Sequence, residues 1–313
     1  MDKKIIQSHD RFFKNLFSGK NEIKEFVIKT FPTEITEKLE LETLELDQTE
    51  YVDSKLRTTY SDLVYNCKYG NNIDIKISLL FEHKSSPEKF PHFQLLGYML
   101  KIWETQIRQN QELTPIIPII FYHGKSKWTN KPFEKYFKDL DDTLQNFIPK
   151  FDYQLIDTSE FTDDEIIKLF ESLRLQIGIL VMKNIFNEQK ILQETNKIFA
   201  NLNQLLQTEQ GEQFYETIVA YLLYATGIDA QKYAENMKTI SQKAEKKFVS
   251  TAMKLKTEGI EQGIEQGIEQ GIKKVAFSLI NQGISDEIIL NATNLTKKQL
   301  DYLKTLKEYK LEI

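Results

Sequence analysis

Hydrophobic and polar residues alternate most regularly between residues 73 and 84. One face of this segment would carry Ile73, Ile75, Ile77, Leu79 and Phe81, and the other Asp74, Lys76, Ser78, Leu80, Glu82 and Lys84. A two-residue period is typical of a β-strand with one buried face. Residues 61–69 predict a preceding strand, and residues 70–72 predict a turn between the two. We therefore expect an antiparallel hairpin.

Helices and one further strand are predicted on either side of this hairpin. Apolar residues recur at helical spacing over residues 8–31, with a break at 18–21, and residues 41–53 predict one or two strands. Residues 90–109 predict a helix with a buried stripe of Phe93, Leu96, Leu100, Trp103 and Ile107. The apolar run 115–123 predicts a strand buried on both faces, and its place after a helix predicts parallel pairing.

The rest of the chain has a mostly helical pattern, from about residue 163 onward. Residues 259–272 repeat Gly-Ile-Glu-Gln three times and then Gly-Ile, which predicts a semi-flexible helical linker or a self-association helix. The segment 273–309 predicts three short helices. Gly283 would end the first, Ser285 or Asp286 would cap the second, and Thr296 with Gln299 would form a capping box on the third.

We therefore expect an α/β protein in three parts. Residues 1–215 form the main domain, with a core at about 5–125. Residues 216–272 form a helical region that includes the repeat linker. Residues 273–313 form a small helical domain, for which a helix-turn-helix is the alternative to a packing or regulatory role.

The composition and charge of the chain indicate where the protein is located and what it binds. No run approaches the roughly 18 apolar residues of a membrane span, so we expect no membrane partner. No signal-peptide pattern is visible at the N-terminus, and Cys67 is the only cysteine, so we expect a cytoplasmic protein without an intrachain disulfide. The net charge of -5 gives no chain-wide attraction to DNA, although binding depends on where the charges lie.

Candidate chemistry is concentrated at the end of the hairpin far from its turn. Glu82 and Lys84 share one face of their strand, and antiparallel pairing would bring Asp62 to the same end. The two carboxylates and the main-chain carbonyl of His83 are oxygen ligands that suit Mg²⁺, with another divalent cation as the alternative. A metal there would activate a water molecule, and Lys84 would orient that water and stabilise charge on phosphorus. The pattern predicts phosphodiester hydrolysis.

An isolated Glu-x-Lys on a strand is usually a plain surface ion pair. Three features favour a catalytic site instead. The pair ends the most hydrophobic strand, an Asp lies on the neighbouring strand, and the next helix carries a polar stripe of Gln94, Tyr98 and Lys101 that would face the same cleft.

Four ordered motifs resemble one known family. They are residues His9–Phe17, Tyr60–Tyr65, Phe81–Ser86 and Pro118–Gly124. Together they are similar to the Rpn family of recombination-promoting nucleases, also labelled YhgA-like transposases, over roughly residues 5–215. This resemblance implies the PD-(D/E)XK superfamily, with a restriction-endonuclease-like mixed central sheet flanked by helices. It also implies a Mg²⁺-dependent DNA endonuclease.

By the same resemblance, Asp62, Glu82 and Lys84 match the superfamily's acidic and basic residues. Gln94 and Tyr98 match the Gln-x-x-x-Tyr that often follows, so we count Gln94 among the catalytic residues and Tyr98 and Lys101 among the DNA contacts. The N-terminal motif adds Asp10, which would cap the first helix, and Lys14, which would contact phosphate.

Several expectations stay open at this point. His123 would border the cleft or make a turn contact, whereas His83 is better explained as a packed histidine than as a side-chain metal ligand. Lys297 and Lys298 would contact DNA if the last helices form a helix-turn-helix. The repeat or the C-terminal helices would support a homo-oligomer. The alternatives to an endonuclease are a non-catalytic DNA-binding or regulatory protein on a nuclease scaffold and a transposase-associated protein.

Overall fold

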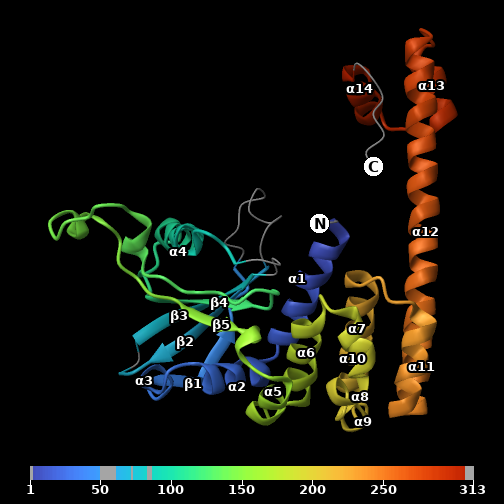
Figure 1. Cartoon of the computed structure of the whole chain (residues 1–313). Coiled ribbons are helices and arrows are strands. Elements are labelled where there is room, and N and C mark those ends of the chain that lie inside the picture. Colours follow the sequence, from blue (N-terminus) through green and yellow to red (C-terminus); the bar gives the residue numbers. More distant parts are fainter. Residues whose placement is uncertain (1–2, 50–60, 72, 83–86, 307–313) are drawn as a thin grey trace. The chain divides into compact units, whose positions relative to one another are not determined.

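The computed structural model describes residues 3–49, 61–71, 73–82 and 87–306. The chain divides into two compact units, Met1–Thr251 and Ala252–Ile313. The first unit is built around a five-stranded sheet whose spatial order follows the chain: β1 (Leu39–Leu46), β2 (Ser61–Tyr69), β3 (Ile73–Glu82), β4 (Ile116–Tyr122) and β5 (Gln154–Asp157) (Figure 1).

The sheet is mixed. Strands β1, β2 and β3 pair antiparallel, whereas β3, β4 and β5 pair parallel. The predicted α/β class, the hairpin of β2 and β3 and the parallel pairing of β4 are therefore confirmed.

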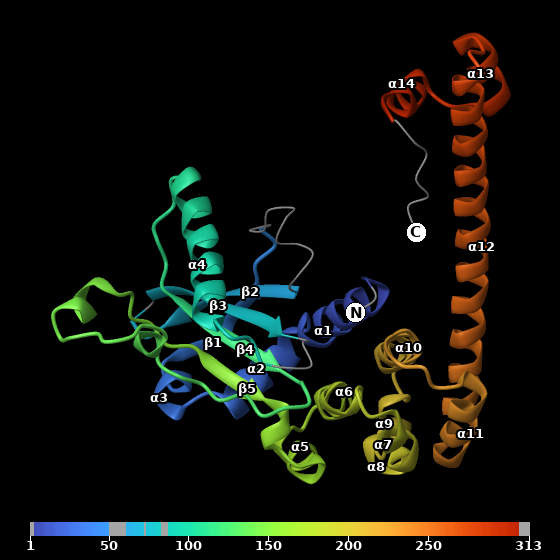
Figure 2. The ribbon, with the colours of Figure 1, turned by 45° about the horizontal axis from the view of Figure 1, so that its top comes forward.

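Helices cover both faces of the sheet (Figure 2). On one face lie α1 (Lys3–Phe17), α2 (Lys20–Thr30) and the short α3 (Thr33–Thr36), and α1 and α2 are separated at the predicted break. Phe121 of β4 is fully buried on this side, with its ring centroid 5.5 to 5.9 Å from the rings of Phe13, Phe17 and Phe26.

Helix α4 (Pro91–Arg108) covers the other face. Leu95 and Tyr98 pack with Ile120 and Tyr122 of β4, while Met99 and Ile102 pack with Val64 of β2 and Ile116 of β4. The buried stripe expected for this helix is wrong, because Phe93, Leu100 and Ile107 are 50%, 47% and 60% exposed. Apolar residues occur around most of the helix, so helical spacing alone did not identify the side that packs on the sheet.

Strand β5 was not predicted, since its four residues are too few to show alternation. Further elements of this unit, in chain order, are the 3-10 turns η1 (Phe133–Tyr136), η2 (Leu144–Phe147) and η3 (Thr158–Glu160), followed by the helices α5 (Asp163–Leu169), α6 (Leu173–Asn184), α7 (Glu188–Gln193), α8 (Thr195–Ile198), α9 (Leu202–Leu205), α10 (Glu209–Ala225) and α11 (Ala230–Ile240). The mostly helical character expected after residue 163 is confirmed.

Helices α6 and α10 pack against α1. A Cβ atom at Gly178 of α6 would lie 2.7 Å from Leu16 of α1, so the two helices approach closely because Gly178 lacks a side chain. The ring of Phe12 stacks on Tyr221 of α10, with centroids 4.3 Å apart. The N-terminal motif, residues 9–17, thus packs against the later helices through its aromatic side chains.

Within its described residues, 252–306, the second unit contains three helical segments. Helix α12 (Gln242–Asn281) begins in the first unit and continues through the repeat, where Ile260, Ile264 and Ile268 are more than half exposed. The first of the three short helices expected after residue 273 is instead the end of α12. Helices α13 (Asp286–Thr293) and α14 (Lys297–Thr305) follow, and Ala276, Ile289, Leu300 and Leu303 form their small shared core.

The expected turn chemistry between these helices is largely confirmed. Gly283 has a φ of 71°, a left-handed conformation that favours glycine. Thr296 and Gln299 form the expected capping box at the start of α14. Ser285 occupies the N-cap position of α13, but its side chain makes no capping hydrogen bond.

Candidate functional site

The backbone register places the two predicted acidic positions at one end of the hairpin. Asp62 pairs with Leu80, which is two residues before Glu82, and Glu82 pairs with Tyr122 of β4. The hairpin turn lies at the opposite end of both strands. The side chains of Asp62 and Glu82 lie outside the described part of the structure, as do the whole of His83 and Lys84.

These register positions belong to the face of the sheet that α4 covers. Val64 packs against α4 and pairs with Ser78, and every second position along a strand lies on the same face. Positions 62, 80 and 82 therefore share the face of Val64. Among the described residues, Leu95 and Tyr98 near the beginning of α4 pack with Tyr122, the partner of Glu82 in β4.

Gln94 and Tyr98 lie one helical turn apart near the beginning of α4. The amide nitrogen of Gln94 is buried and has no hydrogen-bond partner within the described residues. Tyr98 is 6% exposed and packs with Leu95, Ile120 and Tyr122. Lys101, the third residue of the predicted stripe, pairs with Glu104 at 3.2 Å on a more exposed part of the helix.

A buried ion pair on the same face of the sheet was missed by the sequence analysis. The ammonium of Lys76 lies 2.5 Å from the carboxylate of Asp47 and 2.6 Å from the side-chain oxygen of Asn66. Both charged side chains are only 8% exposed. The alternation in β3 placed Lys76 on the polar face. It gave no sign that the partner, Asp47, directly follows β1, three residues before the undescribed segment that leads to β2.

Residues of the N-terminal motif lie near the same end of the parallel strands. His123, which follows the partner of Glu82 in β4, has its ring centroid 5.4 Å from that of His9. His123 is fully buried and donates from Nδ1 to the main-chain oxygen of Met182 at 3.0 Å. His123 is therefore a core residue that is hydrogen-bonded to α6. The expected turn contact is replaced by this hydrogen bond.

Asp10 lies in the middle of α1, which begins at Lys3, so the expected helix-capping role is wrong. Burial raises the pKa of the Asp10 carboxyl to about 6, and the charge of Lys14 one turn later opposes this rise. Burial thus makes the Asp10 carboxyl, next to His9 in the sequence, easier to protonate than a surface aspartate.

The remaining lysines proposed as DNA contacts differ in their surroundings. Lys14 and Lys298 are exposed. Lys297 lies 2.6 Å from Asp286 and 3.4 Å from Asp301, and Lys304 also pairs with Asp286. Any contact of Lys297 with phosphate would compete with these two acids.

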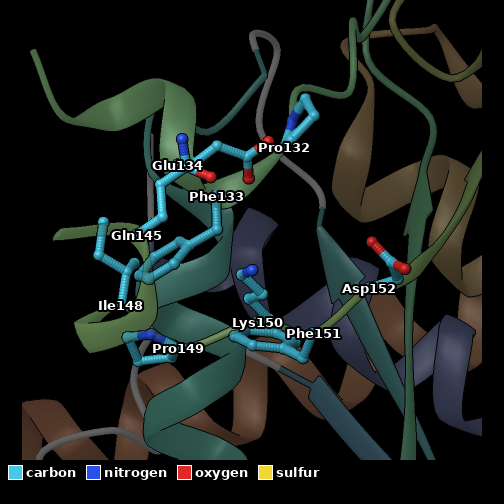
Figure 3. Close-up of a pocket in the computed structure, with 9 residues that line it drawn as sticks. All are labelled: Pro132, Phe133, Glu134, Gln145, Ile148, Pro149, Lys150, Phe151 and Asp152. Carbon is cyan, nitrogen blue, oxygen red and sulfur yellow. The ribbon is translucent and has the colours of Figure 1, made fainter. Parts of the chain in front are cut away.

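A hollow of about 400 Å³ opens on the connection between β4 and β5 (Figure 3). It is lined by Pro132, Phe133, Glu134, Gln145, Ile148, Pro149, Lys150, Phe151 and Asp152. None of the residues assigned to the catalytic site from the sequence lines this hollow. The hollow is therefore a feature separate from the acidic end of the hairpin.

Neither a membrane-spanning helix nor a metal-ligand cluster occurs within the described residues. None of the described helices is both long enough and apolar enough to cross a membrane. No group of three or more His, Cys, Asp or Glu residues in the described part of the chain is placed to hold a metal ion. The predicted ligand groups of Asp62, Glu82 and His83 lie outside the described part of the structure.

Known proteins resemble the chain over most of its length. A family model described as "putative transposase, YhgA-like" matches residues 7–213. The recombination-promoting nuclease RpnC of Escherichia coli K12 is 26% identical over 96% of this chain and 98% of its own. RpnD of Escherichia coli O157:H7, named as a recombination-promoting nuclease, is 26% identical over 67% of this chain and 85% of its own.

Two similar proteins, RpnE and YjiP of Escherichia coli K12, are named as inactive. RpnE of Escherichia coli K12, an inactive recombination-promoting nuclease-like protein, is 24% identical over 92% of this chain and 94% of its own. No solved structure matches the chain.

Proposed function

Since the chain belongs to the YhgA-like family, we propose that it is a metal-dependent DNA endonuclease that acts in recombination. Two relatives that carry the name of recombination-promoting nuclease support this function. The observation that carries the proposal is the hairpin register, which brings positions 62 and 82 to the same end and the same face of the sheet.

The metal site would be formed by oxygen ligands. Asp62 and Glu82 would supply carboxylates and His83 a main-chain carbonyl, a donor set that suits Mg²⁺. A bound Mg²⁺ would supply polarisation of the scissile phosphate and a lowered pKa for a coordinated water. The order of hairpin, helix and parallel strand also supports a PD-(D/E)XK core within about residues 5–125.

The remaining residues would bind and orient the reactants. Lys84 would hold the attacking water and stabilise negative charge on the phosphate oxygens. Gln94 fits a role beside it, because its buried amide nitrogen has hydrogens to donate and no partner among the described residues. Lys101 and Lys14 would contact phosphates of the DNA, whereas Tyr98 is too deeply buried for the DNA contact expected of it and would stabilise the core beneath α4.

Nicking of a supercoiled plasmid tests this function. Purified protein should convert the plasmid to open circles with Mg²⁺ and not with EDTA. Asp62→Asn should slow nicking by about tenfold or more, because asparagine keeps one oxygen ligand but loses the negative charge that attracts the cation.

Asp74→Asn is the matched control for this substitution. Asp74 lies on β3 near the hairpin turn and pairs with Lys68 at 2.7 Å on the surface. Its replacement should leave nicking unchanged. Equal nicking by all three proteins, or nicking that persists in EDTA, would refute the metal site.

A non-catalytic DNA-binding protein on the same scaffold is the second candidate, because RpnE is named as inactive. It predicts DNA binding without Mg²⁺-dependent nicking by the wild-type chain. The same plasmid assay, followed by a gel-shift measurement, separates the two candidates.

A further inference from the structure

Three aromatic rings form a half-exposed cluster at the beginning of α4. The ring centroids of Phe90, Phe93 and Tyr136 lie 5.3 to 6.0 Å from one another. Phe90 is 42% and Phe93 50% exposed, although large aromatic side chains usually gain free energy from burial. We call these three residues the aromatic platform.

The platform is held from beneath by buried groups. The ring of Phe133 lies 5.1 Å from Phe93 and 5.7 Å from Tyr136. The hydroxyl of Tyr136 hydrogen-bonds with Nδ1 of His92 at 3.1 Å. Because the supporting residues are fixed in the core, the exposed rings are presented in a defined arrangement rather than as scattered surface side chains.

Two lysine ammonium groups lie over the platform. Lys131 is 4.1 Å from the ring centroid of Tyr136, and Lys89 is 5.2 Å from that of Phe90. Glu88, the acid next to Lys89, accepts hydrogen bonds from the backbone N–H groups of Lys89 and Phe90. The surface therefore combines flat apolar rings with two ammonium groups, and the negative charges of Glu88 and Glu134 act on Tyr136 and His92 in the same region. Rings and ammonium groups together are the chemistry that binds an unpaired base and its flanking phosphates.

The platform also lies next to the proposed catalytic residues in the chain. Phe93 directly precedes Gln94, and Phe90 follows Lys84 by six residues. Phe133 additionally lines the hollow beside η1, together with Phe151, Lys150 and the acids Glu134 and Asp152 (Figure 3). A strand leaving the platform would thus meet two further aromatic rings, one cation and two acids.

We propose that the aromatic platform stacks an unpaired base of the DNA substrate, so that the preferred substrate has single-stranded character beside the cut. This proposal rests on the DNA endonuclease function proposed above. It assigns the substrate class from the three rings and the two lysines, none of which belongs to the metal site.

Binding in EDTA tests the platform without cleavage. Fluorescence anisotropy of the full chain should show tighter binding of a single-stranded oligonucleotide than of the same sequence as a duplex. The double variant Phe90→Leu and Phe93→Leu keeps apolar bulk but removes two stacking surfaces. It should weaken single-strand binding by about tenfold or more and leave duplex binding within about twofold.

Phe147→Leu is the matched control, because Phe147 is 80% exposed and lies outside the platform. It should bind both oligonucleotides as the wild type does. A single strand that carries 5-iodouracil should also photocrosslink to the wild-type chain at Phe90, Phe93 or Tyr136, as located by mass spectrometry. This measurement does not depend on whether a variant folds.

Three results would overturn the proposal: unchanged single-strand binding by the double variant, crosslinks confined to other residues, or tighter binding of the duplex or of the matching RNA. Plasmid nicking measured on the same preparations separates this failure from that of the nuclease function. Mg²⁺-dependent nicking without single-strand preference would refute the platform alone, whereas platform binding without nicking would refute the nuclease alone.

Discussion

Lys84→Ala should lower the Mg²⁺-dependent nicking rate by about 100-fold to 1,000-fold, the loss typical of removing one group that stabilises transition-state charge. Lys84 is two residues beyond Glu82 on the predicted continuation of β3, so it would lie on the same face as the metal ligands. Alanine can neither hold the attacking water nor balance charge on the phosphate. Initial rates of open-circle formation at saturating Mg²⁺ provide the measurement.

Lys68→Ala is the control for this prediction. Lys68 lies on β2 and pairs with Asp74 at 2.7 Å, and Asp74 is eight residues before Glu82, or roughly 26 Å along an extended strand. Loss of such a surface pair costs at most about 1 kcal/mol of stability. Lys84→Ala should therefore nick the plasmid far more slowly than Lys68→Ala. Similar nicking rates from the two variants, both folded, would mean that Lys84 takes no part in the reaction.

Lys76→Met should destabilise the first unit by about 3 to 5 kcal/mol, because it leaves the carboxylate of Asp47 buried without its ammonium partner. Both side chains are 8% exposed, and Lys76 also donates to Asn66. Methionine is similar in length, so the cavity it leaves is small and the electrostatic loss dominates. Urea unfolding followed by circular dichroism measures the change in unfolding free energy.

The double variant Asp47→Leu and Lys76→Met should recover much of this loss, because neither buried charge then remains without its opposite charge. Lys101→Met is the surface control, since Lys101 pairs with Glu104 where both side chains are more than one third exposed. A Lys76→Met variant that loses less than about 1 kcal/mol would mean that Asp47 reaches water in the native state.

The central part of the fold could be predicted because its signals are local. Alternation over β3, the turn after β2 and the uninterrupted apolar residues of β4 each determine a strand within one short segment. The order of strand, helix and strand then determines parallel pairing, since the crossover between parallel strands requires such a connection. The predicted hairpin register follows from the same turn.

Features that depend on distant partners were not predictable. The buried face of α4 is selected by Val64, Ile120 and Tyr122, which come from strands on either side of it in sequence. The buried state of Lys76 depends on Asp47, and the core position of His123 depends on Met182. Strand β5 forms because β4 offers a free edge for parallel pairing, which its own four residues do not reveal.

Only part of the candidate site could be predicted from the sequence. Sequence spacing sufficed to place Asp62 and Glu82 at one end of a hairpin, because register is a property of the backbone. It could not identify the aromatic platform, whose rings come from Phe90, Phe93 and Tyr136 and meet only when η1 folds against α4.

The proposal that Asp62 and Glu82 hold one metal ion is tested most directly by Mn²⁺ binding. Electron paramagnetic resonance would follow Mn²⁺ added to the Lys84→Ala chain with a duplex oligonucleotide, so that substrate is bound but not cut. We predict that Mn²⁺ binding to the Lys84→Ala chain is saturable and that Mg²⁺ displaces the bound Mn²⁺. Adding Glu82→Gln to this chain should abolish Mn²⁺ binding, whereas adding Asp74→Asn should leave it unchanged. Equal Mn²⁺ binding with and without the Glu82 carboxylate would contradict the account.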